Sequence, residues 1–254
     1  MVNLILNEKS YIIRLNKEEY MGKIVAISGG DLESTDSLNR FAIQLTEKET
    51  PTILFIPTAS YDANGYIEKI RNYYSRYNCE VDCLCLYTNA YSSKEIENKF
   101  KNVDLIYIGG GDTENMIKKW KEFLIDDFIL KAYENGKVIS GISAGAIFWF
   151  KYGHSDSEYF TNPDKWKYKF IEGLDVFSAA FCPHYNEEGR NSFDNMLMDI
   201  KEVGFALEND TAFIVIDNIK YIKKSNSNAH AYMIVYKDNV IDKIELEENA
   251  NIKI

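Results

Sequence analysis

At 254 residues the chain is long enough for one large α/β domain, and no linker rich in proline, glycine and serine divides it. Its 39 acidic residues outnumber its 29 basic ones, and the resulting net charge of -10 argues against nucleic-acid and anionic-lipid partners. The apolar runs are too short to span a bilayer and the first residues do not resemble a secretory signal, so we expect a cytoplasmic protein without a membrane partner.

Strands and helices alternate from residue 24 onward, after a first segment, residues 1–20, that we interpret as an added N-terminal hairpin. Strands are expected at residues 24–28, 52–56, 81–86, 105–108 and 138–142, and helices at 37–46, 66–77, from 92 onward, at 114–120 and at 123–135. The helix that follows Ser92 begins with a capping box formed by Ser92 and Glu95. This alternation predicts an α/β fold with a mostly parallel, doubly wound sheet that carries helices on both faces.

The alternation stops after residue 150. Residues 151–170 are rich in aromatic and polar side chains without a clear period, which favours a loop or lid. A strand is expected at 176–181, a helix at 192–203, and further strands at 205–207, 212–216, 221–224, 232–236 and 240–246. The last four suit an antiparallel meander, so we expect one α/β domain over residues 1–254 with antiparallel strands near its C-terminus.

The cysteine spacing is not that of a metal site. Cys79, Cys83, Cys85 and Cys182 form no C-x-x-C motif, and Cys83 and Cys85 fall on one face of an expected strand. Reduced thiols in the core are the ordinary interpretation of such residues. We therefore expect no metal, no other cofactor and no disulfide.

Ser143 stands at the centre of the sequence Gly141-Ile142-Ser143-Ala144-Gly145, where an apolar strand runs directly into a helix-compatible segment. This is the pattern of a nucleophile elbow, because a serine at a strained strand-to-helix turn needs small neighbours two residues away on either side. A second glycine cluster, Gly109-Gly110-Gly111, ends another buried strand. The carboxyl ends of parallel strands meet at one edge of a sheet, so both loops are expected to converge, with Ser143 as the nucleophile.

A serine hydroxyl needs a base, usually histidine, and the chain offers three. His154 would start about 15 Å from the elbow, given 1.5 Å of rise per helical residue. His230 follows a hairpin-like turn remote from the active edge of the sheet, whereas His184 stands just past a strand end, after Pro183. We therefore expect His184 to be the general base.

A third group, best a carboxylate, should hold the imidazole in the right tautomer. Glu208 follows the short strand at 205–207 and has a suitable strand-end position. Asp156 and Glu158 lie in the lid-like segment and are alternatives. The residues alone leave this choice open.

Two further roles complete the expected site. The backbone N–H of Ala144 and that of Gly110 or Gly111 are expected to form an oxyanion hole. Arg190, six residues after His184, is a candidate for binding a substrate carboxylate, because its guanidinium fork matches a carboxylate through two parallel hydrogen bonds. The alternative is that Arg190 pairs with Glu187, Glu188 or Asp194 and caps the following helix.

Three motifs resemble, in their order, those of the peptidase E (aspartyl dipeptidase) and cyanophycinase family of serine peptidases, whose fold is similar to class I glutamine amidotransferases. They are Gly109-Gly110-Gly111-Asp112-Thr113, Gly141-Ile142-Ser143-Ala144-Gly145-Ala146 and Pro183-His184-Tyr185. The resemblance covers roughly residues 23–215.

The resemblance implies Ser143 as nucleophile, His184 as base and the triple-glycine loop as oxyanion donor. A glutamate of the family's Ser-His-Glu triad aligns with Glu208, while an aspartate after the elbow, also proposed in the family, keeps Asp156 as an alternative. An arginine that peptidase E proteins carry after the elbow has no counterpart in residues 152–156, so the resemblance does not extend to aspartyl specificity.

We therefore expect a serine-type peptidase that hydrolyses short peptides, in the manner of a dipeptidase, through a Ser-His-acid triad and an acyl-enzyme. Two alternatives stay open: a hydrolase of another amide or an isopeptide with the same fold, and a catalytically silent amidotransferase-like binding protein. The expected partner is a small peptide substrate, and the sequence leaves a homodimer open.

Overall fold

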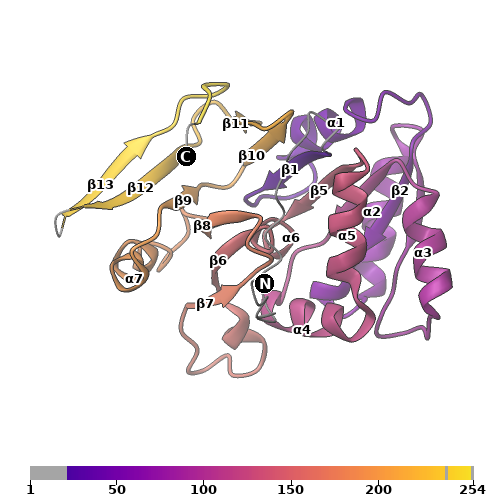
Figure 1. Ribbon diagram of the computed structural model, residues 1–254, viewed down its shortest axis with the longest axis horizontal. Coiled ribbons are helices and arrows are strands. Elements are labelled where there is room, and N and C mark those ends of the chain that lie inside the picture. Colours follow the sequence, from indigo (N-terminus) through magenta and orange to yellow (C-terminus); the bar gives the residue numbers. More distant parts are fainter. Residues whose placement is uncertain (1–21, 238–239, 253–254) are drawn as a thin grey trace, which may run out of the picture.

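The computed structural model describes residues 22–237 and 240–252, and in them the strands form two sheets (Figure 1). The hairpin expected at residues 1–20 lies outside the described residues. The first sheet has the strand order β11-β10-β1-β5-β4-β2-β3. Its parallel strands are β1 (Lys23–Ile27), β2 (Thr52–Ile56), β3 (Glu80–Cys83), β4 (Leu105–Ile108) and β5 (Val138–Ile142), and β10 (Thr211–Ile216) and β11 (Ile219–Lys224) extend it as antiparallel strands.

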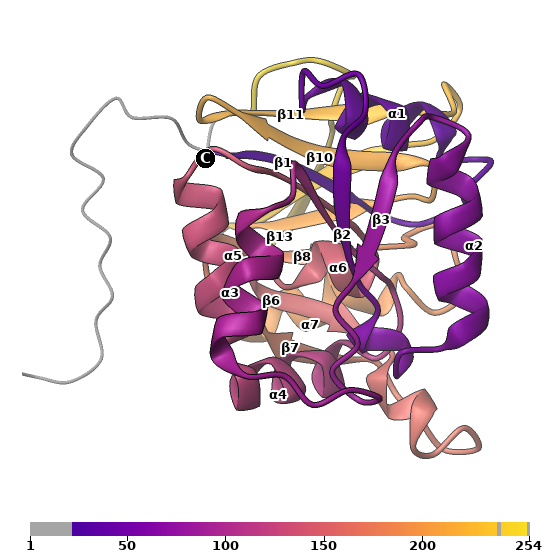
Figure 2. The same ribbon diagram turned by 90° about the vertical axis from the view of Figure 1, so that its right-hand side faces the viewer.

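Helices cover both faces of this sheet, and Figure 2 shows α2 on one side and α3 and α5 on the other. The helices are α1 (Asp36–Gln44), α2 (Asn64–Ser75), α3 (Ser93–Lys101), α4 (Thr113–Phe123) and α5 (Ile125–Glu134). Successive residues of a strand face opposite layers. In β1, Val25 and Ile27 belong to the apolar cluster of α1 and α2, whereas Ile24 and Ala26 belong to that of α3, α4 and α5. The predicted doubly wound α/β arrangement is confirmed for this sheet.

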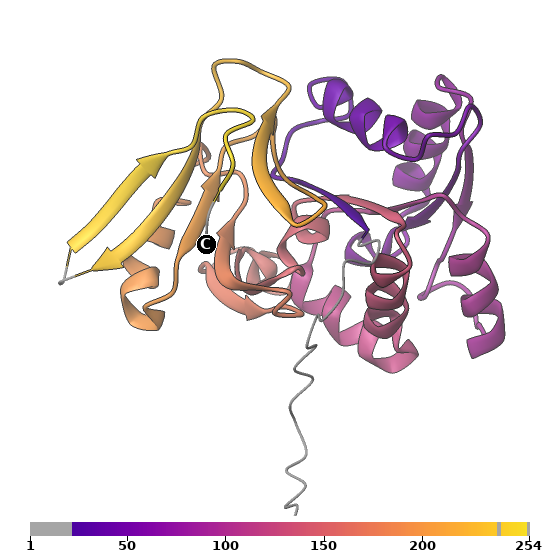
Figure 3. The ribbon, with the colours of Figure 1, turned by 45° about the horizontal axis from the view of Figure 1, so that its top comes forward.

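The second sheet was not predicted, and Figure 3 shows its strands beside the helix-covered part. Its order is β13-β12-β9-β8-β6-β7. The strands are β6 (Phe150–Ser155), β7 (Lys169–Glu172), β8 (Phe177–Cys182), β9 (Gly204–Leu207), β12 (Ala231–Lys237) and β13 (Val240–Glu245), and α7 (Ser192–Ile200) packs against them. Phe213 of β10 joins the two sheets, because its ring contacts those of Phe150, Phe177 and Phe205 at centroid distances of 5.0–5.5 Å.

The segment expected to be a loop or lid contains two strands. β6 and β7 pair antiparallel within residues 151–170 and just beyond, and a short 3-10 helix, η2 (Ser157–Phe160), lies between them. Residue 153 of β6 is a glycine, because a β-carbon at this position would collide with Ile147. The glycine interrupts the alternation of side chains that would otherwise identify β6 as a strand in the sequence. Only the connection between η2 and β7 matches the expectation of an irregular loop.

The antiparallel strands near the C-terminus are confirmed, but they do not form one meander. β10 and β11 pair in the first sheet, while β12 and β13 pair in the second. The chain leaves the second sheet after β9, adds β10 and β11 to the first, and returns with β12, which pairs with β9. In the described part of the chain, no helix has the length and apolar character needed to cross a membrane.

Candidate active site

Ser143 occupies a strained turn between β5 and the short helix α6 (Ala144–Ile147). Its φ of 55° and ψ of -110° lie outside the regions that side-chain-bearing residues ordinarily adopt. Both flanking glycines are required, since a β-carbon at Gly141 would collide with the carbonyl of Gly145, and one at Gly145 would collide with the carbonyl of Ile108. The local sequence therefore produces the elbow geometry that the G-x-S-x-G pattern predicts.

The structure brings Ser143 and His184 together from segments 41 residues apart. Nε2 of His184 lies 2.9 Å from Oγ of Ser143. His184 follows β8, and its backbone N–H donates to Oγ of Ser28, 2.9 Å away, at the end of β1. Ser28 in turn donates to the carbonyl of Leu207 at the end of β9, 2.6 Å away. The backbone of His184 is thus held by the ends of strands from both sheets.

The other ring nitrogen of His184 contacts two residues that are not among the predicted site residues. Nδ1 lies 2.7 Å from Oδ1 of Asn209 and 3.2 Å from Oε1 of Glu187. Nδ2 of Asn209 also donates to that carboxylate, over 3.0 Å. The hydrogen bond with His184 lowers the pKa of Glu187 to about 2, against the opposing effect of burial and with help from Asn209. An amide backed by an ionised carboxylate therefore orients the imidazole.

The three carboxylates expected as candidates for the third group have other partners in the structure. The carboxylate of Glu208 accepts the backbone N–H of His230 at 2.8 Å, that of Asp156 pairs with Arg190, and that of Glu158 accepts the N–H of Lys167 at 3.1 Å. Among the described residues, none of the three bonds to His184. The residue that contacts His184 is Asn209, the next residue after Glu208. Neighbouring side chains at the end of a strand point in different directions, so Glu208 faces away from the imidazole.

The triple-glycine loop adjoins the elbow, as expected. A β-carbon at Gly110 would lie 3.3 Å from Cβ of Ser143, so no side chain separates the two loops. Gly111 has a φ of 137°, which side chains rarely adopt. The hydroxyl of Tyr66 lies beside this loop: burial raises its pKa, while hydrogen bonds from the backbone of Gly110 and from Tyr107 act against that rise. Ala144 is the first residue of α6, where backbone N–H groups have no partner within the helix.

Arg190 is enclosed rather than open to a substrate. Its side chain is 3% exposed, Nη2 lies 3.2 Å from Oδ2 of Asp156, and Nη1 donates to the carbonyl of His154 over 3.0 Å. The guanidinium also stacks 4.7 Å above the ring of Tyr168. The structure thus places Arg190 in an internal ion pair, as in the alternative considered for it, although with Asp156 rather than with a carboxylate close in sequence.

His154 lies fully buried in the same cluster. Nε2 is 3.0 Å from Oγ of Ser192, Nδ1 is 3.5 Å from Sγ of Cys182, and the ring stacks on Tyr168 at 4.4 Å. Burial, and to a lesser extent the charge of Arg190, lowers the pKa of His154 to about 3. The imidazole is therefore neutral in the folded protein at any pH above about 3.

We expect this buried imidazole to make the protein sensitive to mild acid. Between the ordinary histidine pKa near 6.5 and about 3, the unfolded chain binds a proton at His154 and the folded chain does not, so stability falls as the pH falls. The contribution is about 1.4 kcal/mol per pH unit. Denaturant unfolding at pH 7 and pH 5 should show a smaller loss for His154→Gln than for the parent. The control is His230→Gln, which replaces an exposed histidine. Equal losses of unfolding free energy between pH 7 and pH 5 in the parent, His154→Gln and His230→Gln would contradict the account.

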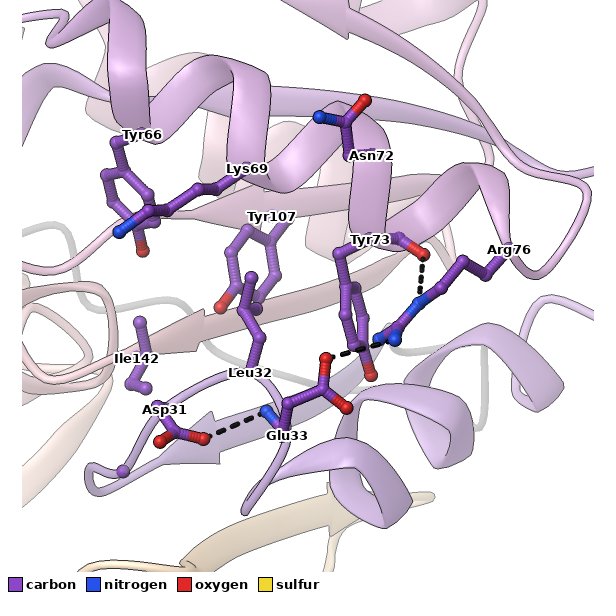
Figure 4. A pocket seen from close by; sticks show the side chains of 11 residues that line it. Asp31, Leu32, Glu33, Tyr66, Lys69, Asn72, Tyr73, Arg76, Tyr107 and Ile142 are labelled. Carbon is purple, nitrogen blue, oxygen red and sulfur yellow. Dashed lines mark hydrogen bonds and ion pairs between the residues drawn. The ribbon is translucent and has the colours of Figure 1, made fainter.

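A cavity of about 560 Å³, here named the α2 cavity, opens beside the elbow (Figure 4). It is lined by residues 30–33 after β1, by the face of α2 that carries Tyr66, Lys69 and Tyr73, and by Ile142 next to Ser143. Among the described residues, no group of three histidine, cysteine, aspartate or glutamate side chains is arranged to hold a metal ion.

The strained serine, the histidine bonded to it and the surrounding α/β fold define a serine hydrolase. The family model of peptidase family S51 matches residues 24–223, and the chain belongs to this family of serine peptidases. The chain is 32% identical over 233 residues to the uncharacterized peptidase YgaJ of Bacillus subtilis (strain 168), an alignment that spans 89% of this chain and 97% of YgaJ. It is 29% identical over 141 residues to the uncharacterized peptidase Lmo0363 of Listeria monocytogenes, covering 53% of this chain and 66% of that protein.

Two solved structures share the fold. A peptidase from an acI-B1 Actinobacterium superimposes with a TM-score of 0.68 at 18% identity, over 94% of this chain and 99% of the other. A candidate peptidase E protein from Listeria monocytogenes EGD-e gives a TM-score of 0.61 at 21% identity, over 80% and 98%. The expected resemblance to the peptidase E family is confirmed.

Proposed function

We propose that this serine peptidase is a dipeptidase-like enzyme that cleaves short peptides through an acyl-enzyme formed on Ser143. The observation that carries the proposal is the 2.9 Å hydrogen bond between Oγ of Ser143, on its strained turn, and Nε2 of His184. A serine hydroxyl becomes a good nucleophile when a base within hydrogen-bond reach removes its proton as it attacks.

His184 is the general base in this proposal. With its proton on Nδ1, the ring donates to Asn209 and Glu187 and keeps the lone pair of Nε2 free to accept the serine proton. The imidazolium that forms then carries a positive charge 3.2 Å from the ionised Glu187. It returns the proton to the leaving amine, and a water molecule activated by the same ring releases the acyl group.

The oxyanion of each tetrahedral intermediate is stabilised by backbone N–H groups of Ala144 and of the triple-glycine loop. Within this loop, Gly110 is the favoured donor because it adjoins the nucleophile: a β-carbon at Gly110 would lie 3.3 Å from Cβ of Ser143. Its N–H faces the hydroxyl of Tyr66 in the free enzyme, so the substrate oxygen displaces that hydroxyl. Losing one such donor typically raises the barrier by about 3 kcal/mol.

Short peptides are the proposed substrates because the α2 cavity is small. Its volume of about 560 Å³ is within the range of small-molecule sites, and residues of helix α2 form part of its wall. A library of dipeptides and longer peptides, followed by mass spectrometry, tests this directly. We expect dipeptides to be cleaved faster than their extended versions. Cleavage of isopeptides or other amides alone would replace the dipeptidase assignment while keeping the serine hydrolase mechanism.

We expect Asn209 and Glu187 to share the task of orienting His184. Each single variant, Asn209→Ala or Glu187→Ala, should lower kcat about tenfold because the other partner remains, and the double variant should lower it about a thousandfold. Steady-state kinetics on one dipeptide, with melting temperatures as a folding check, measures this. Glu188→Ala alters the adjacent exposed carboxylate and should leave kcat unchanged. A double variant as active as either single one would exclude a shared role.

A further inference from the structure

The imidazole of His184 and the carboxylate of Glu187 lie on one short segment, residues 184–190, here named the histidine turn. Oε1 of Glu187 is 3.2 Å from Nδ1 of His184, and the Glu187 side chain is 49% exposed, so packing alone does not confine it. Asn209, the other partner of Nδ1, is held separately, because the next residue of the chain donates its N–H to the carbonyl of Gly29 over 2.9 Å. The position of Glu187 therefore depends on the conformation of the histidine turn.

The backbone of the histidine turn is tightly folded. The N–H of Glu187 donates to the carbonyl of His184 over 2.8 Å, and the N–H of Arg190 donates to the carbonyl of Glu187 over 3.2 Å. His184 has a φ of 54° and Gly189 has a φ of 80°, so both lie in the left-handed region. A residue with a side chain keeps this conformation only where the surrounding structure enforces it. Contacts from outside the turn are therefore needed to hold it.

Arg190, the last residue of the histidine turn, makes such contacts. Its side chain is 3% exposed, Nη1 donates to the carbonyl of His154 in β6 over 3.0 Å, and Nη2 lies 3.2 Å from Oδ2 of Asp156. The guanidinium thus bonds two oxygens of one segment at once, which the single ammonium group of a lysine does not reproduce. Because the desolvation of buried charges offsets their attraction, a gain in net stability alone gives little reason for this pair.

The segment that receives Arg190 is itself fixed beside the active site. β6 follows α6, the short helix that begins after Ser143. Oγ of Ser157, just beyond Asp156, accepts the backbone N–H of Glu114 at the start of α4 over 3.1 Å. Helix α4 follows the triple-glycine loop. Arg190 therefore connects the histidine turn to the chain that leaves the elbow and to the helix that follows the expected oxyanion donors.

We propose that Arg190, paired with Asp156, is a positioning residue for catalysis. It holds the histidine turn in the conformation in which Glu187 meets Nδ1 of His184, and it acts through Glu187 rather than on the substrate. The charge of Arg190 acts in the same direction, because it adds to the effects of His184 and Asn209 that lower the pKa of Glu187. This inference rests on the proposed function and adds to it a residue that orients the base.

The kinetic test uses two variants of Arg190. Arg190→Met removes the charge and both hydrogen bonds, and the side chain of Asp156, which is 37% exposed, then remains in contact with water, so the fold is expected to persist. This variant should lower kcat for a dipeptide about tenfold, as Glu187→Ala does, and leave KM within about twofold, because a displaced carboxylate orients the imidazole no better than an absent one. Arg190→Lys keeps a charge beside Asp156 without the fork and should lose about threefold.

A double-mutant cycle separates positioning from support of the fold. In a Glu187→Ala background, Arg190→Met and Arg190→Lys should each change kcat less than about twofold, because the group through which they act is gone. Melting temperatures check the folding of every variant, and Arg190→Lys decides the question if Arg190→Met does not fold. Lys151→Met is the matched control: it breaks another ion pair of β6, with Glu202 at 2.6 Å, and should leave kcat unchanged.

Three results would overturn the inference: the same loss of kcat with and without Glu187, the kcat of the parent in both Arg190 variants, or a loss confined to KM. Labelling of Ser143 by a fluorophosphonate gives a second readout that needs no peptide, and it should slow in Arg190→Met by about the same factor as kcat. A parent enzyme that neither hydrolyses peptides nor reacts with the fluorophosphonate would instead refute the proposed function.

Discussion

Replacing Ser143 by alanine is expected to lower kcat/KM for the best dipeptide by about ten-thousand-fold or more, because it removes the atom that forms the acyl-enzyme. Binding and oxyanion stabilisation remain, so residual hydrolysis above the uncatalysed rate is expected. Oγ of Ser143 bonds only to His184 among the described residues, and its loss therefore leaves the packing of the elbow intact. Single-turnover kinetics with a dipeptide at enzyme excess measures the loss.

A glycine variant at the same position separates backbone strain from chemistry. Ser143 has a φ of 55°, which alanine tolerates no better than serine, whereas glycine adopts it without strain. Ser143→Gly should therefore melt at a higher temperature than Ser143→Ala, while both are equally inactive. Activity of the alanine variant within tenfold of the parent would exclude Ser143 as the nucleophile.

The second large effect is expected at His184. Without a base, the serine hydroxyl stays protonated at neutral pH and the leaving amine has no proton donor, so His184→Ala should also lose about ten-thousand-fold in kcat. His184 has a φ of 54°, a conformation that asparagine tolerates well among residues with side chains. His184→Asn therefore preserves the local backbone and tests the base alone.

Both His184 variants should keep the peptide affinity of Ser143→Ala, since the ring acts on the proton rather than on substrate binding. His230→Asn is the control, because the side chain of His230 is solvent-exposed and pairs with Glu245 at 2.6 Å rather than with Ser143. An active His184→Asn enzyme, or an equally inactive His230→Asn enzyme, would assign the base elsewhere.

The tight turn at Ser143 and the position of His184 after a strand end could be predicted from the sequence because both depend on local patterns. Ser143 lies between glycines that only a tight strand-to-helix turn requires, and His184 follows a strand end fixed by Pro183. Their convergence follows from the rule that parallel strands end at the same edge of a sheet. The helices on both faces of the first sheet could be predicted for the same reason, since apolar periodicity is a local signal.

The residues that contact the second ring nitrogen of His184 depend on tertiary structure. Asn209 is not predictable from a triad pattern, because the third group of a triad is expected to be a carboxylate and not an amide. The carboxylate behind it, Glu187, stands only three residues after His184 and has the sequence context of a surface charge. Tyr66 lies beside the triple-glycine loop through the packing of α2, which no spacing in the sequence reveals. The second sheet was missed because Gly153 interrupts the side-chain alternation of β6.

The central claim is that Ser143 is a nucleophile activated by His184, and covalent labelling tests it most directly. The parent protein should be incubated with a fluorophosphonate, and its intact mass and tryptic peptides should then be measured by mass spectrometry. The account predicts one adduct per chain, located on Ser143, and little or no adduct on His184→Asn over the same time. An adduct on a different residue, or peptide hydrolysis by a protein that stays unlabelled, would contradict it.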